Sequence, residues 1–153
     1  MSDLPFEITD ELRTQLLAIG WSEDRRVDIS ADVALAEKNG WQIFPLARAV
    51  LEQFDGLGLR NNIQFNLNDV GTSWTYDIQT DGDPNFPEFE RSHQQKLYPL
   101  AVEDAWSPLF ITDSGLIVQF TDDEPHWRGL TPQKDFEDLF GQMYIYRSNK
   151  EHL

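Results

Sequence analysis

The chain has 153 residues, of which 40% are hydrophobic, and it includes five Trp and ten Phe, so it can bury the core of one domain. It contains no cysteine, which excludes thiol catalysis and cysteine-bound zinc, and no apolar run of the ~18 residues that span a membrane. Its net charge of −15 argues against direct binding to nucleic acid or to an anionic membrane. The N-terminus is acidic where a signal peptide would be basic, so we expect a cytoplasmic protein.

The first part of the chain is predicted to be helical. Thr9 is a suitable N-cap for a helix over residues 10–19, which Gly20 would end. Ser30 can cap a second helix over residues 31–38, which an Asn-Gly pair would stop.

The clearest helix begins at Pro45, whose fixed backbone angle suits a first helical position, and ends before Gly56. Its apolar residues recur at helical spacing, which predicts a face buried against a sheet. The residues predicted to be buried on this face are Leu46, Val50, Leu51 and Phe54.

The middle of the chain changes to a strand-like pattern. Residues 63–67 and 73–78 alternate between apolar and polar, which predicts a hairpin. Residues 80–90 contain two prolines and no periodicity, which favours a loop. Residues 97–102 read as an edge strand, since Pro99 cannot donate to a ladder.

The best hairpin signal joins residues 109–112 to residues 116–120 through Asp-Ser-Gly, and these runs are predicted to form the centre of the sheet. An acidic connection follows, and a Thr-Pro pair then predicts a last helix over residues 132–140. Residues 142–153 read as a polar tail.

Patterns that carry chemistry are weak. The sequence has three His and lacks the nucleophile elbow, phosphate-binding loop and zinc motifs. A possible calcium loop begins at Asp77, but Gln79 and Pro84 break its pattern. We therefore predict no enzyme activity, no metal and no cofactor, with a small hydrolase or a calcium-binding module as the alternative.

The negative charge is concentrated in residues 69–124, which hold 12 acidic side chains beside Arg91 and Lys96 and so carry a net charge of −10. Such a surface can serve solubility alone, or it can attract a cationic partner. Both interpretations remain open from composition.

Several short phrases resemble those of a known family. They are Ile19-Gly20-Trp21, Arg25-Arg26-Val27-Asp28, Gly40-Trp41, Phe44-Pro45-Leu46-Ala47 and Phe54-Asp55-Gly56-Leu57, with Leu97-Tyr98-Pro99, Ile111 to Ile117 and Leu139-Phe140-Gly141 later in the chain. Together these phrases are similar to the SUKH superfamily, specifically its third immunity-protein subfamily. In that subfamily the Pro-led helix ends in Phe-Gly-Gly-Leu, and Asp55 here takes the place of the first glycine.

The resemblance implies a single α+β domain over residues 1–153, with a core of about 9–141. A mostly antiparallel sheet would carry N-terminal helices packed on it and a C-terminal helix. Trp21 would fill the core, and Arg25 or Arg26 would pair with Asp28 or another local carboxylate.

The resemblance also implies a function in bacterial polymorphic toxin systems. The protein would bind and neutralise a cognate toxin by occlusion, and the toxin would be a basic nuclease or nucleic-acid deaminase domain. The alternative is a non-catalytic interaction adaptor on the same fold. The oligomeric state stays open.

We predict that two loops, 77–90 and 121–127, supply much of the partner-binding surface, because exposed aromatic anchors ringed by charge are typical of tight interfaces. The predicted aromatic anchors are Phe86, Phe89 and Trp127. The predicted acidic contacts are Asp77, Asp81, Asp83, Glu88, Glu90, Asp122, Asp123 and Glu124.

Overall fold

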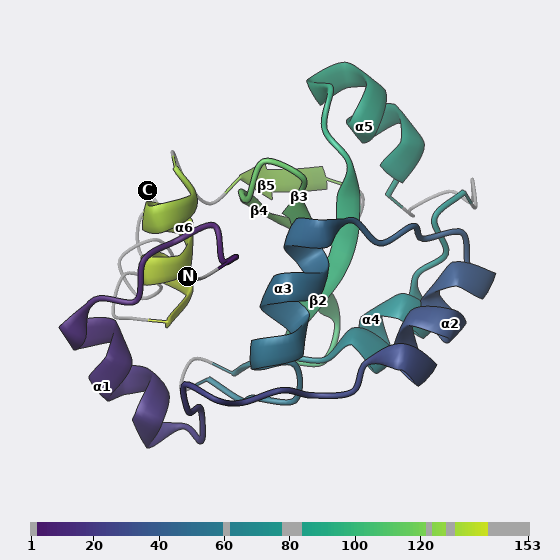
Figure 1. Cartoon of the computed structure of the whole chain (residues 1–153). Helices are drawn as coiled ribbons and strands as arrows, with labels where there is room; N and C mark the ends of the chain where they lie inside the picture. The colour runs from purple at the N-terminus through teal and green to yellow at the C-terminus, as the bar shows by residue number, and fades with distance from the viewer. Residues whose placement is uncertain (1–2, 60–61, 78–83, 122–123, 128–130, 141–153) are drawn as a thin grey trace.

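The computed structural model describes residues 3–59, 62–77, 84–121, 124–127 and 131–140, which form one α+β domain (Figure 1). The helices are α1 (Asp10–Ala18), α2 (Ser30–Lys38), α3 (Pro45–Phe54), α4 (Leu67–Ser73), α5 (Phe86–His93) and α6 (Pro132–Phe140). The strands are β1 (Ile63–Phe65), β2 (Leu97–Glu103), β3 (Ser107–Thr112), β4 (Ile117–Thr121) and β5 (Glu124–Trp127). The predicted fold class is therefore confirmed.

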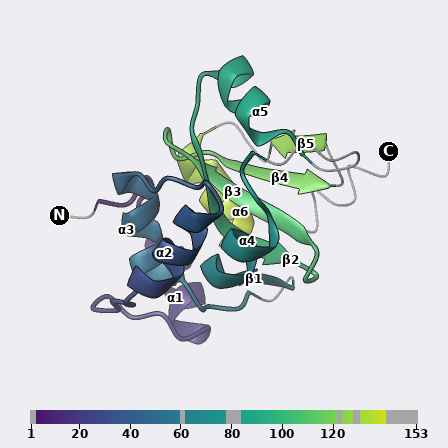
Figure 2. The ribbon, with the colours of Figure 1, turned by 90° about the vertical axis from the view of Figure 1, so that its right-hand side faces the viewer.

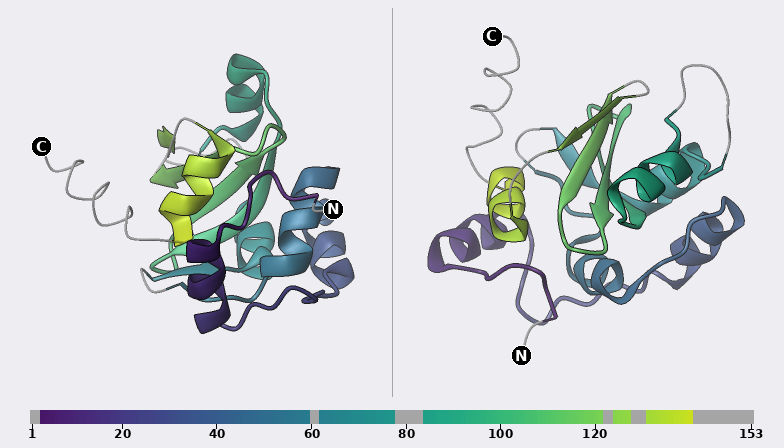
Figure 3. Two further views of the ribbon diagram at one scale, coloured as in Figure 1. Left: turned by 60° about the vertical axis from the view of Figure 1, so that its left-hand side comes forward. Right: turned by 90° about the horizontal axis from the view of Figure 1, so that it is seen from above.

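The strands form one antiparallel sheet in the order β1-β2-β3-β4-β5. The predicted hairpin of β3 and β4 is confirmed, and β3 is the central strand. Every residue of β2 and β3 is buried, because helices lie on both sides of the sheet. Figure 3 shows α5 and α6 on opposite sides of the strands, and α2 packs beside α4 (Figure 2).

The prediction that β2 is an edge strand is wrong, because β2 lies between β1 and β3. Pro99 is accommodated in a different way. β1 pairs with Ala101–Glu103, so among the described residues no strand lies on that side of the part of β2 that holds Pro99. A register shift between Pro99 and Ala101 further interrupts the ladder there.

The first helices begin much as predicted, with one difference. Thr9 caps α1, since its Oγ1 accepts a hydrogen bond from the Leu12 N–H at 3.2 Å. Ser30 is not the cap of α2 but its first residue, and its N–H donates to Asp28 Oδ1 at 3.0 Å. Hydrogen bonding from Ser30 lowers the pKa of Asp28 below its ordinary value.

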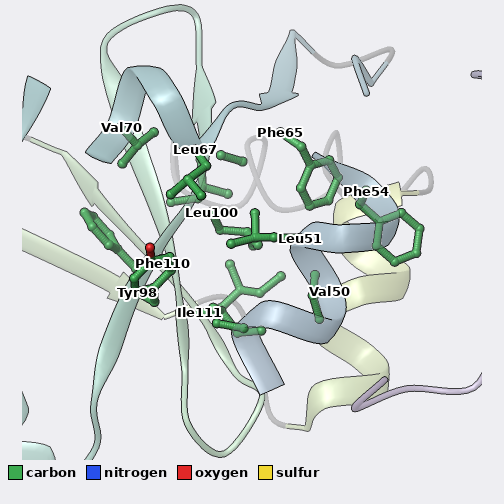
Figure 4. Packing of buried hydrophobic residues seen from close by; sticks show 14 of the residues in the cluster. Val50, Leu51, Phe54, Phe65, Leu67, Val70, Tyr98, Leu100, Phe110 and Ile111 are labelled. Carbon is green, nitrogen blue, oxygen red and sulfur yellow. The ribbon is translucent and has the colours of Figure 1, made fainter. Parts of the chain in front are cut away.

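Helix α3 supplies the centre of the core, as predicted, and Figure 4 shows Val50 and Leu51 pointing toward Ile111 of β3. Val50, Leu51 and Phe54 are fully buried, whereas Leu46 is only partly buried. On the sheet, we predict from the sequence that Phe110, Ile111, Leu116 and Val118 form the opposite wall of this core. Phe110, Ile111 and Val118 are buried, whereas Leu116 lies just before β4 and is only partly buried.

The residues that carry the family resemblance near α3 have structural roles. Trp21 lies in the core as predicted and stacks on Phe54, with ring centroids 6.4 Å apart. Of the predicted pairings of Arg25 or Arg26 with Asp28 or another local carboxylate, none with Asp28 is found among the described residues, whereas the charge of Arg25 acts on the Asp55 carboxyl group. Arg25 instead donates to the backbone carbonyls of Gln53 and Asp55, and so ties residue 25 to the end of α3.

Three elements depart from the prediction. The predicted hairpin of β1 with residues 73–78 is wrong. The residues after β1 form α4, whose N-cap Asn66 accepts a hydrogen bond from the Asp69 N–H at 3.0 Å, and residues 74–77 are not in a strand. The predicted loop over residues 80–90 contains the start of α5, which Asn85 caps through the Glu88 N–H. The acidic connection after β4 contains β5.

The segment before α1 is joined to α6, which begins at the predicted Thr-Pro pair. Phe6 stacks on Phe136 with ring centroids 4.3 Å apart. The Glu7 N–H donates to Gln133 Oε1 at 2.7 Å, and Gln133 Nε2 donates back to the Glu7 carbonyl at 3.0 Å. A pair of reciprocal hydrogen bonds and a ring stack therefore hold the two ends of the domain together.

Candidate partner-binding surface

The exposed acidic residues of the two predicted segments are spread over three elements. Asp77 follows α4, Glu88 lies in the first turn of α5, and Glu124 begins β5, and all three side chains are exposed. Four further predicted residues, Asp81, Asp83, Asp122 and Asp123, lie outside the described residues, as does the Trp127 side chain.

Phe86 and Phe89 are not exposed anchors, so this part of the prediction is wrong. They are 1% and 5% exposed, because α5 turns both rings toward the sheet. Phe86 packs against Trp41 and Phe110 with ring centroids 4.9 Å apart in both pairs. A segment predicted as a loop is in fact an amphipathic helix whose aromatic face belongs to the core.

Glu90 is used within the fold. Its carboxylate accepts hydrogen bonds from the Tyr76 hydroxyl and from the Leu97 N–H, the latter at 2.7 Å. Burial and the hydrogen bond to Glu90 raise the pKa of Tyr76 to about 12, so this phenol stays protonated. Glu90 therefore joins α5 to the start of β2.

The two predicted segments do lie near each other. Phe89 of α5 contacts Phe120 of β4 with ring centroids 5.7 Å apart, and Phe120 pairs with Pro125 of β5. Helix α5 and β5 lie in the same part of the molecule (Figures 1 and 2). The structure thus brings the acidic residues on α5 and β5 to neighbouring elements.

An aromatic residue that sequence reasoning missed is Trp106, whose side chain is 55% exposed. It lies in the connection between β2 and β3, which contains Asp104, Ala105 and Trp106. The available signal was a Trp in a short link between two predicted strands. Its exposure depends on the turn geometry, which composition does not reveal.

Among the described residues, no group of His, Asp or Glu is placed to hold a metal ion. A hollow of about 490 Å³ beside α3 is lined by Arg26, Arg48, Asp3 and Glu52 among others. No Ser, Thr or His is among the described residues that line it. No described helix has both the length and the hydropathy to cross a membrane.

A model of the SUKH-3 immunity protein family matches residues 8–127, which includes the elements from α1 to β5. The chain belongs to the SUKH-3 immunity protein family. No match was found among curated proteins or among solved structures. For a SUKH-3 protein, the relevant surface is one that binds a partner, and the exposed acidic residues and Trp106 are its candidates.

Proposed function

We propose that this SUKH-3 protein binds a cognate bacterial toxin in the cytoplasm and neutralises it by covering the toxin's active surface, without chemistry of its own. The family match over residues 8–127 carries this proposal. The net charge of −15 supports it, because toxins that act on nucleic acid present basic surfaces to bind phosphate. A nuclease or nucleic-acid deaminase domain is therefore the proposed partner.

The acidic residues near α5 and β5 are the proposed contacts. Asp77, Glu88 and Glu124 are exposed. The sequence adds Asp81 and Asp83 between the first two, and Asp122 and Asp123 directly before Glu124. Carboxylates at an interface rim steer a basic partner toward the correct face and raise its association rate. Phe86, Phe89 and Glu90 are not part of this proposal, since the fold uses them.

The test begins with the gene beside this one. We expect it to encode a large secreted protein with a basic C-terminal domain, and this domain is the probe. Co-expression should restore growth of bacteria that produce the domain, and the purified protein should abolish its activity on nucleic acid. Binding without inhibition would instead identify an adaptor, and the absence of both binding and protection would overturn the proposal.

A further inference from the structure

Trp106 is the most exposed of the large apolar side chains that the structure describes, at 55%, beside Leu17 at 54% and Leu35 at 38%. Single exposed apolar residues are common on protein surfaces, so exposure alone carries no conclusion. Leu17 and Leu35 lie on helices α1 and α2, where one side must face water. Trp106 lies in the turn between β2 and β3. It differs from the two leucines because hydrogen bonds on both sides of the turn fix its backbone.

The turn has an unfavourable backbone that its neighbours maintain. Asp104 and Ala105 have φ angles of 54° and 68°, a left-handed region that non-glycine residues adopt only at a cost in free energy. The Trp106 N–H donates to the Glu103 carbonyl at 3.2 Å, and the Asp104 N–H donates to the Asn62 carbonyl at 3.0 Å. These bonds fix the direction in which the chain leaves β2 toward Trp106.

A buried polar network lies beneath the turn. Gln119 Nε2 of β4 donates to Glu103 Oε1 at 2.6 Å and to Ser107 Oγ at 3.0 Å, and so joins the two residues that flank the turn. Ser107 Oγ donates in turn to the Phe120 carbonyl at 2.8 Å. Glu103 is 9% exposed, and Ser107 and Gln119 are each 3% exposed. Buried networks of this kind hold one conformation, so the Trp106 backbone is preorganised.

The surroundings of Trp106 are negative. Asp104 is exposed beside it, and the Glu103 carboxyl group lies buried beneath the turn. Glu124 lies at the same end of the sheet, because it pairs with Thr121 at the end of β4, next to the start of β3. An indole ring on a rigid turn among carboxyl groups matches a partner with an apolar pocket and a basic rim.

We infer that Trp106 is the aromatic anchor of this protein's interface, and that it inserts into an apolar pocket bordered by Lys or Arg on the cognate toxin. The inference rests on the proposed function and adds to it the residue and the partner chemistry. Trp is strongly enriched among residues whose truncation costs most in protein interfaces, especially where the side chain is fixed before binding.

The experiment compares Trp106→Ala with Leu17→Ala, a control that removes an equally exposed apolar side chain from α1. The probe is the C-terminal domain of the secreted protein encoded by the adjacent gene. Trp106→Ala should speed dissociation at least about tenfold, whereas Leu17→Ala should change it less than about twofold. Thermal unfolding should show little change in either variant, because both side chains face solvent.

A second measurement needs no substitution. Mild oxidation of tryptophan, mapped by mass spectrometry, should modify Trp106 in the free protein and spare it in the complex. Equal oxidation in both states, or unchanged dissociation of Trp106→Ala from a probe that the wild type binds, would overturn the anchor and leave the proposed function intact. If the wild type neither binds nor protects, the proposed function fails and the anchor fails with it.

Discussion

Asp55 shows how one residue can replace the backbone freedom of a glycine with a specific bond. It follows α3 at the position where the subfamily phrase has its first glycine. Its Oδ1 accepts from the Leu67 N–H at 2.9 Å, which satisfies a donor in the first turn of α4. Burial raises the pKa of Asp55, while the Leu67 hydrogen bond and the charge of Arg25 oppose the increase.

This raised pKa predicts a pH-dependent stability. The folded state holds the Asp55 proton more tightly than the unfolded state, so ionisation of this group opposes folding as the pH rises above 3.8, the ordinary value. Asp55→Asn keeps the acceptor for Leu67 and removes the ionisation. The free energy of unfolding of the variant, measured with urea, should therefore improve relative to wild type as the pH increases toward neutral.

The control for this prediction is Asp55→Ala, which leaves the Leu67 N–H buried without its acceptor. Relative to Asp55→Asn, it should lower the free energy of unfolding by about 1–3 kcal/mol at every pH, because both variants lack the ionisation and only the Ala variant lacks the acceptor. If the free energies of unfolding of wild type and Asp55→Asn differ by the same amount at every pH, the raised pKa of Asp55 is contradicted.

At the level of elements, α3 joins the helical and sheet parts of the core. Phe54 is fully buried, and its ring lies among those of Phe6, Trp21, Phe65 and Phe140. This ring therefore connects the N-terminal segment, α6 and β1 to the same helix.

Phe54→Ala should lower the free energy of unfolding by roughly 3–5 kcal/mol, because it removes a fully buried ring and leaves a cavity. Leu46→Ala on the same helix is the control, and it should cost less because Leu46 is only partly buried. Urea denaturation of both variants measures the difference. Equal losses would show that the two positions contribute alike and that Phe54 does not occupy the core.

The sequence predicted the N-terminal helices, α6 and the β3–β4 hairpin because each has a local stop or start signal. Gly20, Gly40, Gly56 and Gly115 all adopt positive φ, which glycine allows. The helices α4 and α5 were missed, since their start depends on asparagine caps in segments that otherwise read as strand or loop. Leu67 and Phe86 are buried by contacts with distant parts of the chain, and these contacts stabilise α4 and α5. A local sequence pattern carries no information about such contacts.

The charge of the candidate surface could be predicted from the sequence, but the exposure of its aromatic residues could not. The acidic composition of residues 69–124 is visible in the sequence, and the exposed Glu88 and Glu124 follow from it. The burial of Phe86 and Phe89 depends on the missed helix α5, so they were assigned to the surface. The exposure of Trp106 depends on left-handed residues at a two-strand turn, for which Asp104 and Ala105 give no glycine signal.

On the scale of the whole molecule, a net charge of −15 acts over distances longer than any single contact. Changing Asp122, Asp123 and Glu124 to their amides should slow association with the basic toxin domain and flatten its dependence on salt. Rim charges act mainly on the encounter rate, and salt screens them beyond about 10 Å at 0.1 M. Stopped-flow association at several ionic strengths measures both effects.

The control for this charge prediction is a variant with Glu7, Glu11 and Glu37 changed to Gln, which removes the same charge from exposed positions in the N-terminal part. This control variant should slow association less than the change of Asp122, Asp123 and Glu124 does. Equal slowing by the two variants would show that only net charge matters, and no slowing by either would leave the acidity as a solubility feature.

The reciprocal hydrogen bonds between Glu7 and Gln133 join residues 126 positions apart. A ribosome that adds about 5–20 residues per second needs roughly 6–25 s to reach the second partner after it has made the first. During that interval Phe6 has no Phe136 to stack on, so the domain cannot close until α6 has been synthesised and has left the ribosome. Newly made molecules therefore become complete only after α6 has been translated, which sets a minimum delay between the start of translation and a closed domain.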